Sequence, residues 1–410
     1  MNVKSVVPEF YTGSPVDSDD LMFRDDFICD LWDLLQTKHI LLTAPRRTGK
    51  TSVMDHLRDH PQNGFIVVYQ NVQDLSHPAD FFLTILDTFQ EEHPQFIATL
   101  AKGWKLVTQA LEKKVEGIEI GTFKVRLRES DPDWRQNWRQ HGEQLLGRIR
   151  KQAGKVLIIV DEFPDMLLNL KKENPELLRE FLAWFRAQRM NPHPSRDMVR
   201  WLIGGSVNLS GTLDAVGMVD LINDLEDIQL PVLKSNQVKD FVGLMLSARK
   251  VAFTAEVPEI LNDLLGRPIP LFMQMATQEL YRLWKHLSRE LTAADVDAVL
   301  EHLVTSTAAR DKLQHYFSRI GKHYEEPRRS AAYVVLTKLS LSKCGLDRKA
   351  LFAEFENLLH GQIPSPHDRQ RQFNQLMRDL ENDFYVIEIR KNRYDFASGL
   401  IKMWWRKYYA

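Results

Sequence analysis

Short apolar runs alternate with longer stretches of helical period over the first 230 residues. Four of these runs, each bounded by polar residues or glycine, lie at residues 39–44, 64–69, 155–160 and 199–204. A continuous apolar run of this length is typical of a strand that is buried on both faces of a parallel sheet. The stretches between the runs carry apolar residues every three or four positions and predict helices. The alternation therefore predicts an α/β unit built on a parallel sheet.

One insertion departs from this alternation. Between positions 117 and 128, Ile118, Ile120, Phe123 and Val125 alternate with polar residues around a central Gly-Thr pair. A Gly-X pair between two alternating segments is typical of a two-residue type II′ turn. We predict a β-hairpin here, either packed on the edge of the sheet or projecting as an arm toward a partner or DNA.

The pattern changes to purely helical after residue 230 and changes again near residue 327. The last part predicts three helices, at about 330–341, 347–359 and 367–380, followed by a hairpin and a final helix. Three helices and a hairpin are the layout of a winged helix. We therefore predict three domains: an α/β core at 1–230, a helical lid at 231–326 and a winged helix at 327–410.

Composition narrows the functional classes. The 410 residues are 44% hydrophobic and 27% charged, which is ordinary for a globular protein and excludes a disordered scaffold. The 54 Lys and Arg residues balance 55 Asp and Glu residues, so the chain is not a globally basic DNA-binding protein. The two cysteines, Cys29 and Cys344, are too few for a disulfide framework. Without a leader or a membrane-length apolar run, we expect a cytoplasmic protein with no membrane partner.

The strongest chemical signal is the segment APRRTGKT at residues 44–51, which follows an apolar run and opens a predicted helix. A phosphate-binding loop has the pattern G-x-x-x-x-G-K-[ST], in which backbone N–H groups wrap the phosphates, Lys contacts them and the hydroxyl binds Mg²⁺. Ala44 stands where the motif has its first Gly. A chance Gly-Lys-Thr sequence in a loop is the alternative reading. We predict that ATP or ADP is bound by Ala44, Pro45, Arg46, Arg47, Thr48, Gly49, Lys50, Thr51 and Ser52.

Two carboxylates follow the third apolar run. Asp161 and Glu162 stand at the predicted carboxyl end of that strand, where nucleotides bind in α/β sheets. We predict that Asp161 shares Mg²⁺ with Thr51, and that Glu162 is the general base toward water. A strand end that only faces solvent is the alternative, but the two motifs together argue against it. After the fourth run, Ser206 is the candidate to contact the γ-phosphate or the attacking water, with Asn208 as a second choice.

These motifs in this order resemble the archaeal-type P-loop ATPases of the STAND and AAA+ branches, which are relatives of the origin-recognition initiators. The likeness rests on Ala-Pro-Arg-Arg-Thr-Gly-Lys-Thr-Ser, Asp-Glu-Phe and Gly-Ser. Weaker matches are Met-Phe-Arg-Asp at 22–25, Leu-Gly-Arg-Pro at 265–268, and Tyr-Asp-Phe at 394–396 with Trp-Trp at 404–405. The resemblance implies a nucleotide held between an α/β core and a helical lid, with a winged helix beyond.

The resemblance also implies roles for residues outside the two motifs. Phe23 and Arg24 would lie near the adenine, Pro268 would touch it, and Arg267 would be a sensor arginine of the lid. Asn71 stands where relatives place a polar switch residue. Without the resemblance, the Gly-Arg-Pro sequence is only a break between helices.

The predicted winged helix carries a candidate contact surface. Arg, Asn and Gln are the side chains that read base edges in the major groove of DNA. From residue 361 to the end, nine Lys and Arg residues face six Asp and Glu residues, a mild surplus. Double-stranded DNA and a partner protein therefore both remain open as its target. The candidate residues are Arg371, Asn374, Gln375, Arg378, Arg390, Lys391 and Arg393.

The sequence thus predicts a Mg²⁺-dependent ATPase whose nucleotide state repositions a lid and a winged helix. Three classes remain open: a DNA-associated ATPase, a STAND-type switch that controls an effector protein, and a module that holds ATP or ADP without turnover. The intact Asp161-Glu162 pair argues against the third class. A nucleotide-dependent homo-oligomer is left open. No arginine finger can be assigned among the four arginines at the matching stage of the chain, which we expect to be solvated surface residues: Arg186, Arg189, Arg196 and Arg200.

Overall fold

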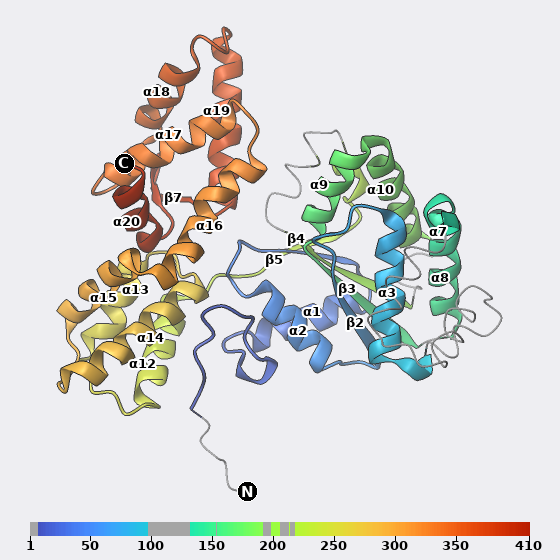
Figure 1. Ribbon diagram of the computed structural model, residues 1–410, viewed down its shortest axis with the longest axis horizontal. Helices are drawn as coiled ribbons and strands as arrows, with labels where there is room; N and C mark the ends of the chain where they lie inside the picture. The colour runs from blue at the N-terminus through green and yellow to red at the C-terminus, as the bar shows by residue number, and fades with distance from the viewer. Residues whose placement is uncertain (1–6, 97–131, 153, 192–197, 206–212, 214–217) are drawn as a thin grey trace, which may run out of the picture. The chain divides into compact units, whose positions relative to one another are not determined.

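The computed structural model describes residues 7–96, 132–152, 154–191, 198–205, 213 and 218–410 (Figure 1). The predicted hairpin at 117–128 lies outside the described residues, as do Ser206 and Asn208. The contacts between residues divide the chain into two compact units. The sheet unit comprises residues 17–44 and 50–230, and the C-terminal unit comprises residues 1–16, 45–49 and 231–410. The finer division at residue 326 stays a prediction.

The sheet unit is built on five parallel strands in the order β2-β3-β4-β1-β5. Because all strands run the same way, their carboxyl ends meet at one edge, where α/β folds bind ligands. The four predicted strands are present, and β5 was not predicted, because its sequence Glu-Asp-Ile-Gln is short and polar. The strands are β1 (Ile40–Thr43), β2 (Phe65–Asn71), β3 (Lys155–Asp161), β4 (Val199–Gly205) and β5 (Glu226–Gln229).

Helices cover both faces of this sheet, so its strands are buried as their apolar runs predict (Figure 1). One face packs against α1 (Asp25–Leu35) and α2 (Lys50–Asp59). The other packs against α3 (Pro78–Glu92), α7 (Pro132–Gln136), α8 (Trp138–Gln152), α9 (Phe163–Glu173) and α10 (Pro175–Met190). The described residues of this unit also include the 3₁₀ helices η1 (Ser18–Asp20) and η3 (Val219–Leu221).

Two of the four arginines considered as fingers are buried and structural. The Arg189 guanidinium donates to both carboxylate oxygens of Asp224, at 2.7 and 2.8 Å. Arg200 donates to the carbonyl oxygens of Leu35 and Gln36 at 2.9 and 2.7 Å, so it caps the C-terminal end of α1. The expectation that Arg189 and Arg200 are surface residues is therefore wrong.

The C-terminal unit begins with the helices that the sequence predicts for the lid. These are α12 (Ser235–Ser247), α13 (Glu256–Leu265), α14 (Pro270–Leu287), α15 (Ala293–Thr305) and α16 (Thr307–His323). The N-terminus of α15 has a capping box, in which the Thr292 backbone N–H donates to Asp295 Oδ2 at 2.8 Å.

Beyond α16 the chain forms three helices and a three-stranded antiparallel sheet with strand order β6-β8-β7, as in a winged helix, followed by a fourth helix. The predicted helices, hairpin and final helix are all present, while the two-residue strand β6 was too short to predict. The elements are α17 (Arg328–Leu341), β6 (Leu346–Asp347), α18 (Arg348–Leu359), α19 (Pro366–Asn382), β7 (Val386–Arg390), β8 (Arg393–Phe396) and α20 (Gly399–Tyr408). The predicted fold class is confirmed.

A buried polar network joins α16 to the winged helix. Arg319 Nη2 donates to Asp383 Oδ1 at 3.1 Å, and Tyr324 Oη donates to Asp383 Oδ2 at 3.0 Å. Nearby, Tyr385 Oη donates to the carbonyl oxygen of Tyr316 at 2.6 Å. Because buried charges are costly without partners, these bonds hold the two segments in one arrangement.

No helix in the described part of the chain is long and apolar enough to cross a membrane.

Candidate functional site

The loop between β1 and α2 has the backbone of a phosphate-binding loop. Positive φ angles occur at Arg47 (67°) and Gly49 (97°), but not at Ala44. Alanine is therefore tolerated where the motif has its first glycine, while Gly49 takes a conformation that favours glycine. Thr48 Oγ1 donates to the Pro45 carbonyl oxygen at 2.6 Å and closes the loop on itself.

The helix after this loop brings its first residues to Asp161. Lys50 Nζ forms an ion pair with Asp161 Oδ1, and Thr51 Oγ1 donates to Asp161 Oδ2 at 2.8 Å. Asp161 is only 1% exposed, and Ser52 is buried in the same turn of α2. The two motifs, 110 residues apart in sequence, thus meet at one carboxylate at the end of β3.

Glu162 stands in strained backbone beside this carboxylate. Its φ and ψ are 56° and 33°, the left-handed region, and its backbone N–H donates to Asp161 Oδ1 at 2.8 Å. A non-glycine residue held there costs about 1–3 kcal/mol, and such residues cluster at functional sites. The strain occurs where β3 ends and α9 begins, with the Glu162 side chain partly exposed at the carboxyl edge of the sheet. The role of Glu162 as general base stays a prediction.

Tyr69 is a site residue that the sequence analysis missed. Its Oη lies 3.3 Å from Asp161 Oδ2, and Asn71, two residues on, pairs in register with Asp161. Burial raises the pKa of Tyr69 to about 12, and the charges of Asp55 and Glu162 add to this rise. The hydroxyl therefore keeps its proton and donates to the carboxylate. Tyr69 is 92 residues from Asp161 in sequence, so the contact can be predicted only when β2 is known to pair with β3.

Gly204 on β4 is a second residue that was missed. A Cβ atom built on it would lie 2.6 Å from Asp161 Oδ1, 2.6 Å from Met54 Cε and 2.9 Å from Lys50 Nζ. Real Cβ atoms essentially never show contacts under 3.0 Å. The ion pair between Lys50 and Asp161 therefore requires glycine, which has no side chain, at position 204. The Gly-Gly pair before Ser206 carried this signal in the sequence, but the contact requires β4 to lie beside β3.

This set of residues fits a nucleotide with Mg²⁺. Mg²⁺ prefers oxygen ligands and is usually held by one or two carboxylates together with substrate phosphates. Thr51 Oγ1 and Asp161 Oδ2 supply such oxygens 2.8 Å apart. The N-terminal end of α2 and the Lys50 ammonium supply the positive potential that phosphates need.

Other predicted residues lie at the periphery of these motifs. Phe23, with a φ of 61°, and the buried Arg24 directly precede α1, and burial lowers the pKa of Arg24 to about 10. Within the C-terminal unit, Arg46 Nη1 lies 3.3 Å from His315 Nε2 on α16. Burial and the positive charges of Arg46 and Arg319, with smaller effects from Arg47 and Lys322, lower the pKa of His315 to about 4.

Arg267 and Pro268 lie between α13 and α14. The guanidinium carbon of Arg267 is 4.2 Å from the ring centroid of Phe384, and its backbone N–H donates to the Ala397 carbonyl oxygen at 2.7 Å. Arg267 thus packs against the winged helix. The roles of both residues toward a nucleotide stay predictions.

The seven candidate contact residues of the winged helix fall into three groups: two amides, four exposed cations, and Arg393. Asn374 Oδ1 accepts from Arg348 Nη2 at 2.9 Å, and Gln375 Nε2 donates to Asp379 Oδ1 at 2.9 Å, so both amides already have partners within the domain. Four cations extend into solvent: Arg371, Arg378, Arg390 and Lys391.

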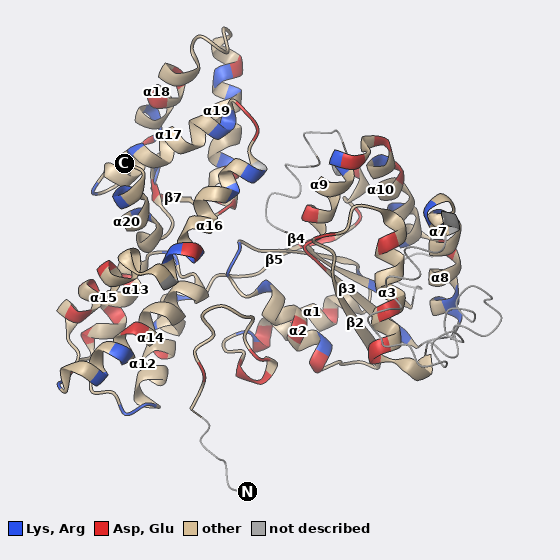
Figure 2. Ribbon diagram, viewed as in Figure 1, with Lys and Arg blue, Asp and Glu red and all other residues tan. Residues whose placement is uncertain are grey.

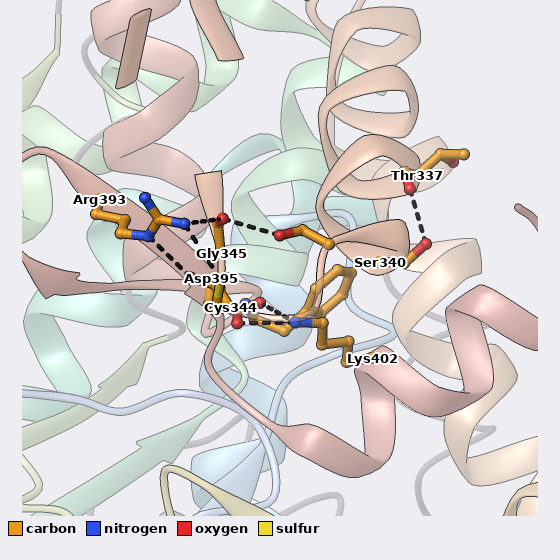
Figure 3. Close-up of polar contacts among 9 residues, drawn as sticks. Thr337, Ser340, Cys344, Gly345, Arg393, Asp395 and Lys402 are labelled. Atoms are coloured by element: carbon orange, nitrogen blue, oxygen red, sulfur yellow. Dashed lines mark hydrogen bonds and ion pairs between the residues drawn. The ribbon is translucent and has the colours of Figure 1, made fainter. Parts of the chain in front are cut away.

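The seventh candidate, Arg393, and the neighbouring Lys402 are held by partners inside the winged helix (Figure 3). Arg393 Nε donates to the Cys344 carbonyl oxygen at 2.9 Å, and its Nη2 donates to the Gly345 carbonyl oxygen at 3.0 Å. Lys402 Nζ contacts both oxygens of Asp395, at 2.6 and 2.8 Å. Arg393 therefore stabilises the turn before β6 as well as standing near the surface.

Comparison with known proteins agrees with this geometry. Residues 35–213 match a family model described as an AAA domain. No curated protein sequence matches the chain significantly. The ORC2 protein of Aeropyrum pernix, in a structure of its ADPNP and ADP complexes, is similar with 12% identity and a TM-score of 0.51, covering 97% of this chain and 94% of that one.

Two other solved structures are also similar to the chain. Cdc6p from Pyrobaculum aerophilum has 12% identity and a TM-score of 0.44, covering 99% of this chain and 98% of that one. The RuvB Holliday junction branch migration motor of Thermotoga maritima has 12% identity and a TM-score of 0.41, covering 94% and 95%. At these identities and scores only the likeness to ORC2 is used, and it shows the fold alone. Residues 35–213 are therefore an AAA domain of the P-loop ATPase type, in a chain with the fold of the archaeal ORC2 protein.

Proposed function

We propose that the protein binds ATP with Mg²⁺ and hydrolyses it, and that the nucleotide state repositions the lid and the winged helix. One observation carries the proposal: Lys50 and Thr51 of the loop both contact Asp161, with Glu162 directly beside it. A chance Gly-Lys-Thr sequence has no reason to meet a buried carboxylate at the carboxyl edge of a parallel sheet. The AAA domain match supports nucleotide binding.

Each residue of the site has a distinct task in this reaction. The loop N–H groups and the Lys50 ammonium hold the phosphates, which replace Asp161 as the partner of Lys50. Thr51 and Asp161 hold Mg²⁺, which neutralises charge on the phosphates when it is bound. Glu162 accepts a proton from the attacking water, and its left-handed backbone fixes the carboxylate beside the metal ligands. Ser206 is the proposed contact to the γ-phosphate.

Two substitutions test this assignment. Lys50→Ala removes the phosphate contact and should abolish binding of a fluorescent ADP analogue. Glu162→Gln keeps shape but cannot accept a proton, so ATP should still bind while phosphate release falls about 10²- to 10⁴-fold. Normal hydrolysis by Glu162→Gln would show that Glu162 is not the base. Wild-type protein that binds ATP but never releases phosphate would support a module that holds the nucleotide without turnover.

Burial of acidic groups favours duplex DNA as the target of the winged helix. Asp379 and Asp383 are buried, and Asp395 is neutralised by Lys402, so they contribute little to the surface. Leaving out the buried Arg369 and the paired Lys402 as well, seven cations face three anions instead of nine facing six, and basic residues recur along α19 (Figure 2). Because Asn374 and Gln375 are engaged within the domain, we propose contact through phosphates rather than base reading.

The test is the salt dependence of binding to a short duplex, measured by fluorescence anisotropy. Removing two phosphate contacts with the double variant Arg390→Ala and Lys391→Ala should flatten the slope of log K against log salt by about 1.8. Lys407→Ala, an exposed cation on α20, is the matched control. A wild-type slope near zero would contradict DNA binding and favour an effector protein as the partner of this domain.

A further inference from the structure

Asp161 receives four donors, and one of them has no part in the assigned motifs. Lys50 Nζ and the Glu162 backbone N–H contact Oδ1, and Thr51 Oγ1 contacts Oδ2. The fourth is the Tyr69 hydroxyl, 3.3 Å from Oδ2. We propose that Tyr69 is a positioning residue, which orients the Asp161 carboxylate so that Oδ2 is presented to Mg²⁺. The inference rests on the proposed function.

Sheet register places the Tyr69 ring where it can act on Asp161. Tyr69 pairs with Ile159 of β3, two residues before Asp161, so the ring extends along the strand toward the carboxyl edge. The face it lies on packs against α2, whose Arg58 guanidinium carbon is 5.7 Å from the ring centroid. The ring thus has a cation beside it, while its hydroxyl points to Asp161.

The Tyr69 hydroxyl can fix the rotation of the Asp161 carboxylate, which matters if this carboxylate is a metal ligand. A monodentate carboxylate must turn the correct oxygen to the cation, and hydrogen bonds to its oxygens set that rotation. Thr51 alone cannot fix Asp161 for this purpose, because its hydroxyl is itself assigned to the metal. Tyr69 has no assigned role with the phosphates or Mg²⁺, so its bond can persist when both ligands are bound. Groups of this kind typically change metal affinity by about 10- to 100-fold.

The test is metal binding rather than turnover. In Tyr69→Phe the ring and its contact with Arg58 remain while the hydroxyl is lost. Mn²⁺ affinity of the ADP-bound protein, measured by electron paramagnetic resonance, should weaken about tenfold, while ADP affinity without metal stays within twofold of wild type. Tyr333→Phe is the matched control, because its Oη donates to the Phe317 carbonyl oxygen at 3.2 Å in the other unit. It should leave Mn²⁺ affinity unchanged.

A double-mutant cycle with Asp161→Asn guards against a general loss of structure. If Tyr69 acts through Asp161, adding Tyr69→Phe to Asp161→Asn should not weaken Mn²⁺ binding further. Unchanged Mn²⁺ affinity in Tyr69→Phe, or equal losses in both backgrounds, would overturn the inference. Wild-type protein that binds neither ADP nor Mn²⁺ would overturn the proposed function and this inference together. Binding without hydrolysis would contradict the turnover alone.

Discussion

Gly204→Ala is the most informative single change at the site, because it adds one methyl group beside the ion pair. The new Cβ would lie 2.6 Å from Asp161 Oδ1, 2.6 Å from Met54 Cε and 2.9 Å from Lys50 Nζ. Met54 Cε and Lys50 Nζ end flexible side chains and can move aside. Asp161 cannot, because it is 1% exposed and its other oxygen is held by Thr51 and Tyr69.

The size of the effect follows from the distance. To reach the 3.0 Å limit of real Cβ contacts, Oδ1 must move by about 0.4 Å, and to reach ordinary contact by about 0.8 Å. Misplacing a catalytic group by ~1 Å can cost ~10²-fold in rate. We therefore expect the kcat/KM of ATP hydrolysis to fall between about tenfold and a hundredfold. Overpacking should also lower the free energy of unfolding by about 1–3 kcal/mol.

The assay combines phosphate release with urea denaturation, so that rate and stability are read on the same protein. Gly147→Ala on α8 is the matched control, because its Cβ would meet no atom within 4 Å. That variant should keep full activity, because the added methyl group displaces no atom. It should not lose stability, because alanine is a better helix former than glycine. A folded Gly204→Ala protein with activity within twofold of wild type would refute the argument that the Lys50–Asp161 geometry depends on this glycine.

Three further predictions concern the C-terminal unit. Asp383→Asn leaves the buried Arg319 without its countercharge, so urea denaturation should show a loss of about 3–5 kcal/mol in unfolding free energy. Tyr324→Phe removes only one neutral donor to Asp383 and should cost about 1 kcal/mol in the same measurement. Because the folded pKa of His315 is lowered to about 4, the unfolded chain binds the extra proton between pH 6.5 and 4, and wild type should lose stability as pH falls through that window. His315→Gln should lose less over the same window in thermal melts, and parallel curves for the two proteins would contradict the shift.

The fold followed from features that are local in the sequence. Four apolar runs gave four of the five strands, and the helical period gave the lid and winged-helix helices. Strand β5 was missed because an edge strand that is only half buried needs no apolar run. The buried Arg200 was taken for a surface residue because its partners are backbone carbonyls at the end of α1, which no side-chain pattern reveals.

The sequence predicted those site residues that are adjacent to one another within a motif. Lys50 and Thr51 stand in one motif and Asp161 with Glu162 in another, and each motif has a pattern of its own. Tyr69 and Gly204 touch Asp161 from the strands on either side of β3, so finding them requires the strand order β2-β3-β4. A single sequence gives the strands but not their order in the sheet.

The close approach of α20 to α13 determines which pieces of this chain can be exchanged between proteins. A Cβ on Gly399 would lie 2.0 Å from the Leu264 carbonyl oxygen, and the Arg267 backbone N–H bonds the Ala397 carbonyl oxygen. A chimera joined at residue 326 would need a foreign partner with glycine at the equivalent of 399 and a matching carbonyl at 397. The lid helices and the winged helix therefore have to be exchanged together, and a new target specificity has to be acquired by changing surface residues of the winged helix rather than by replacing it.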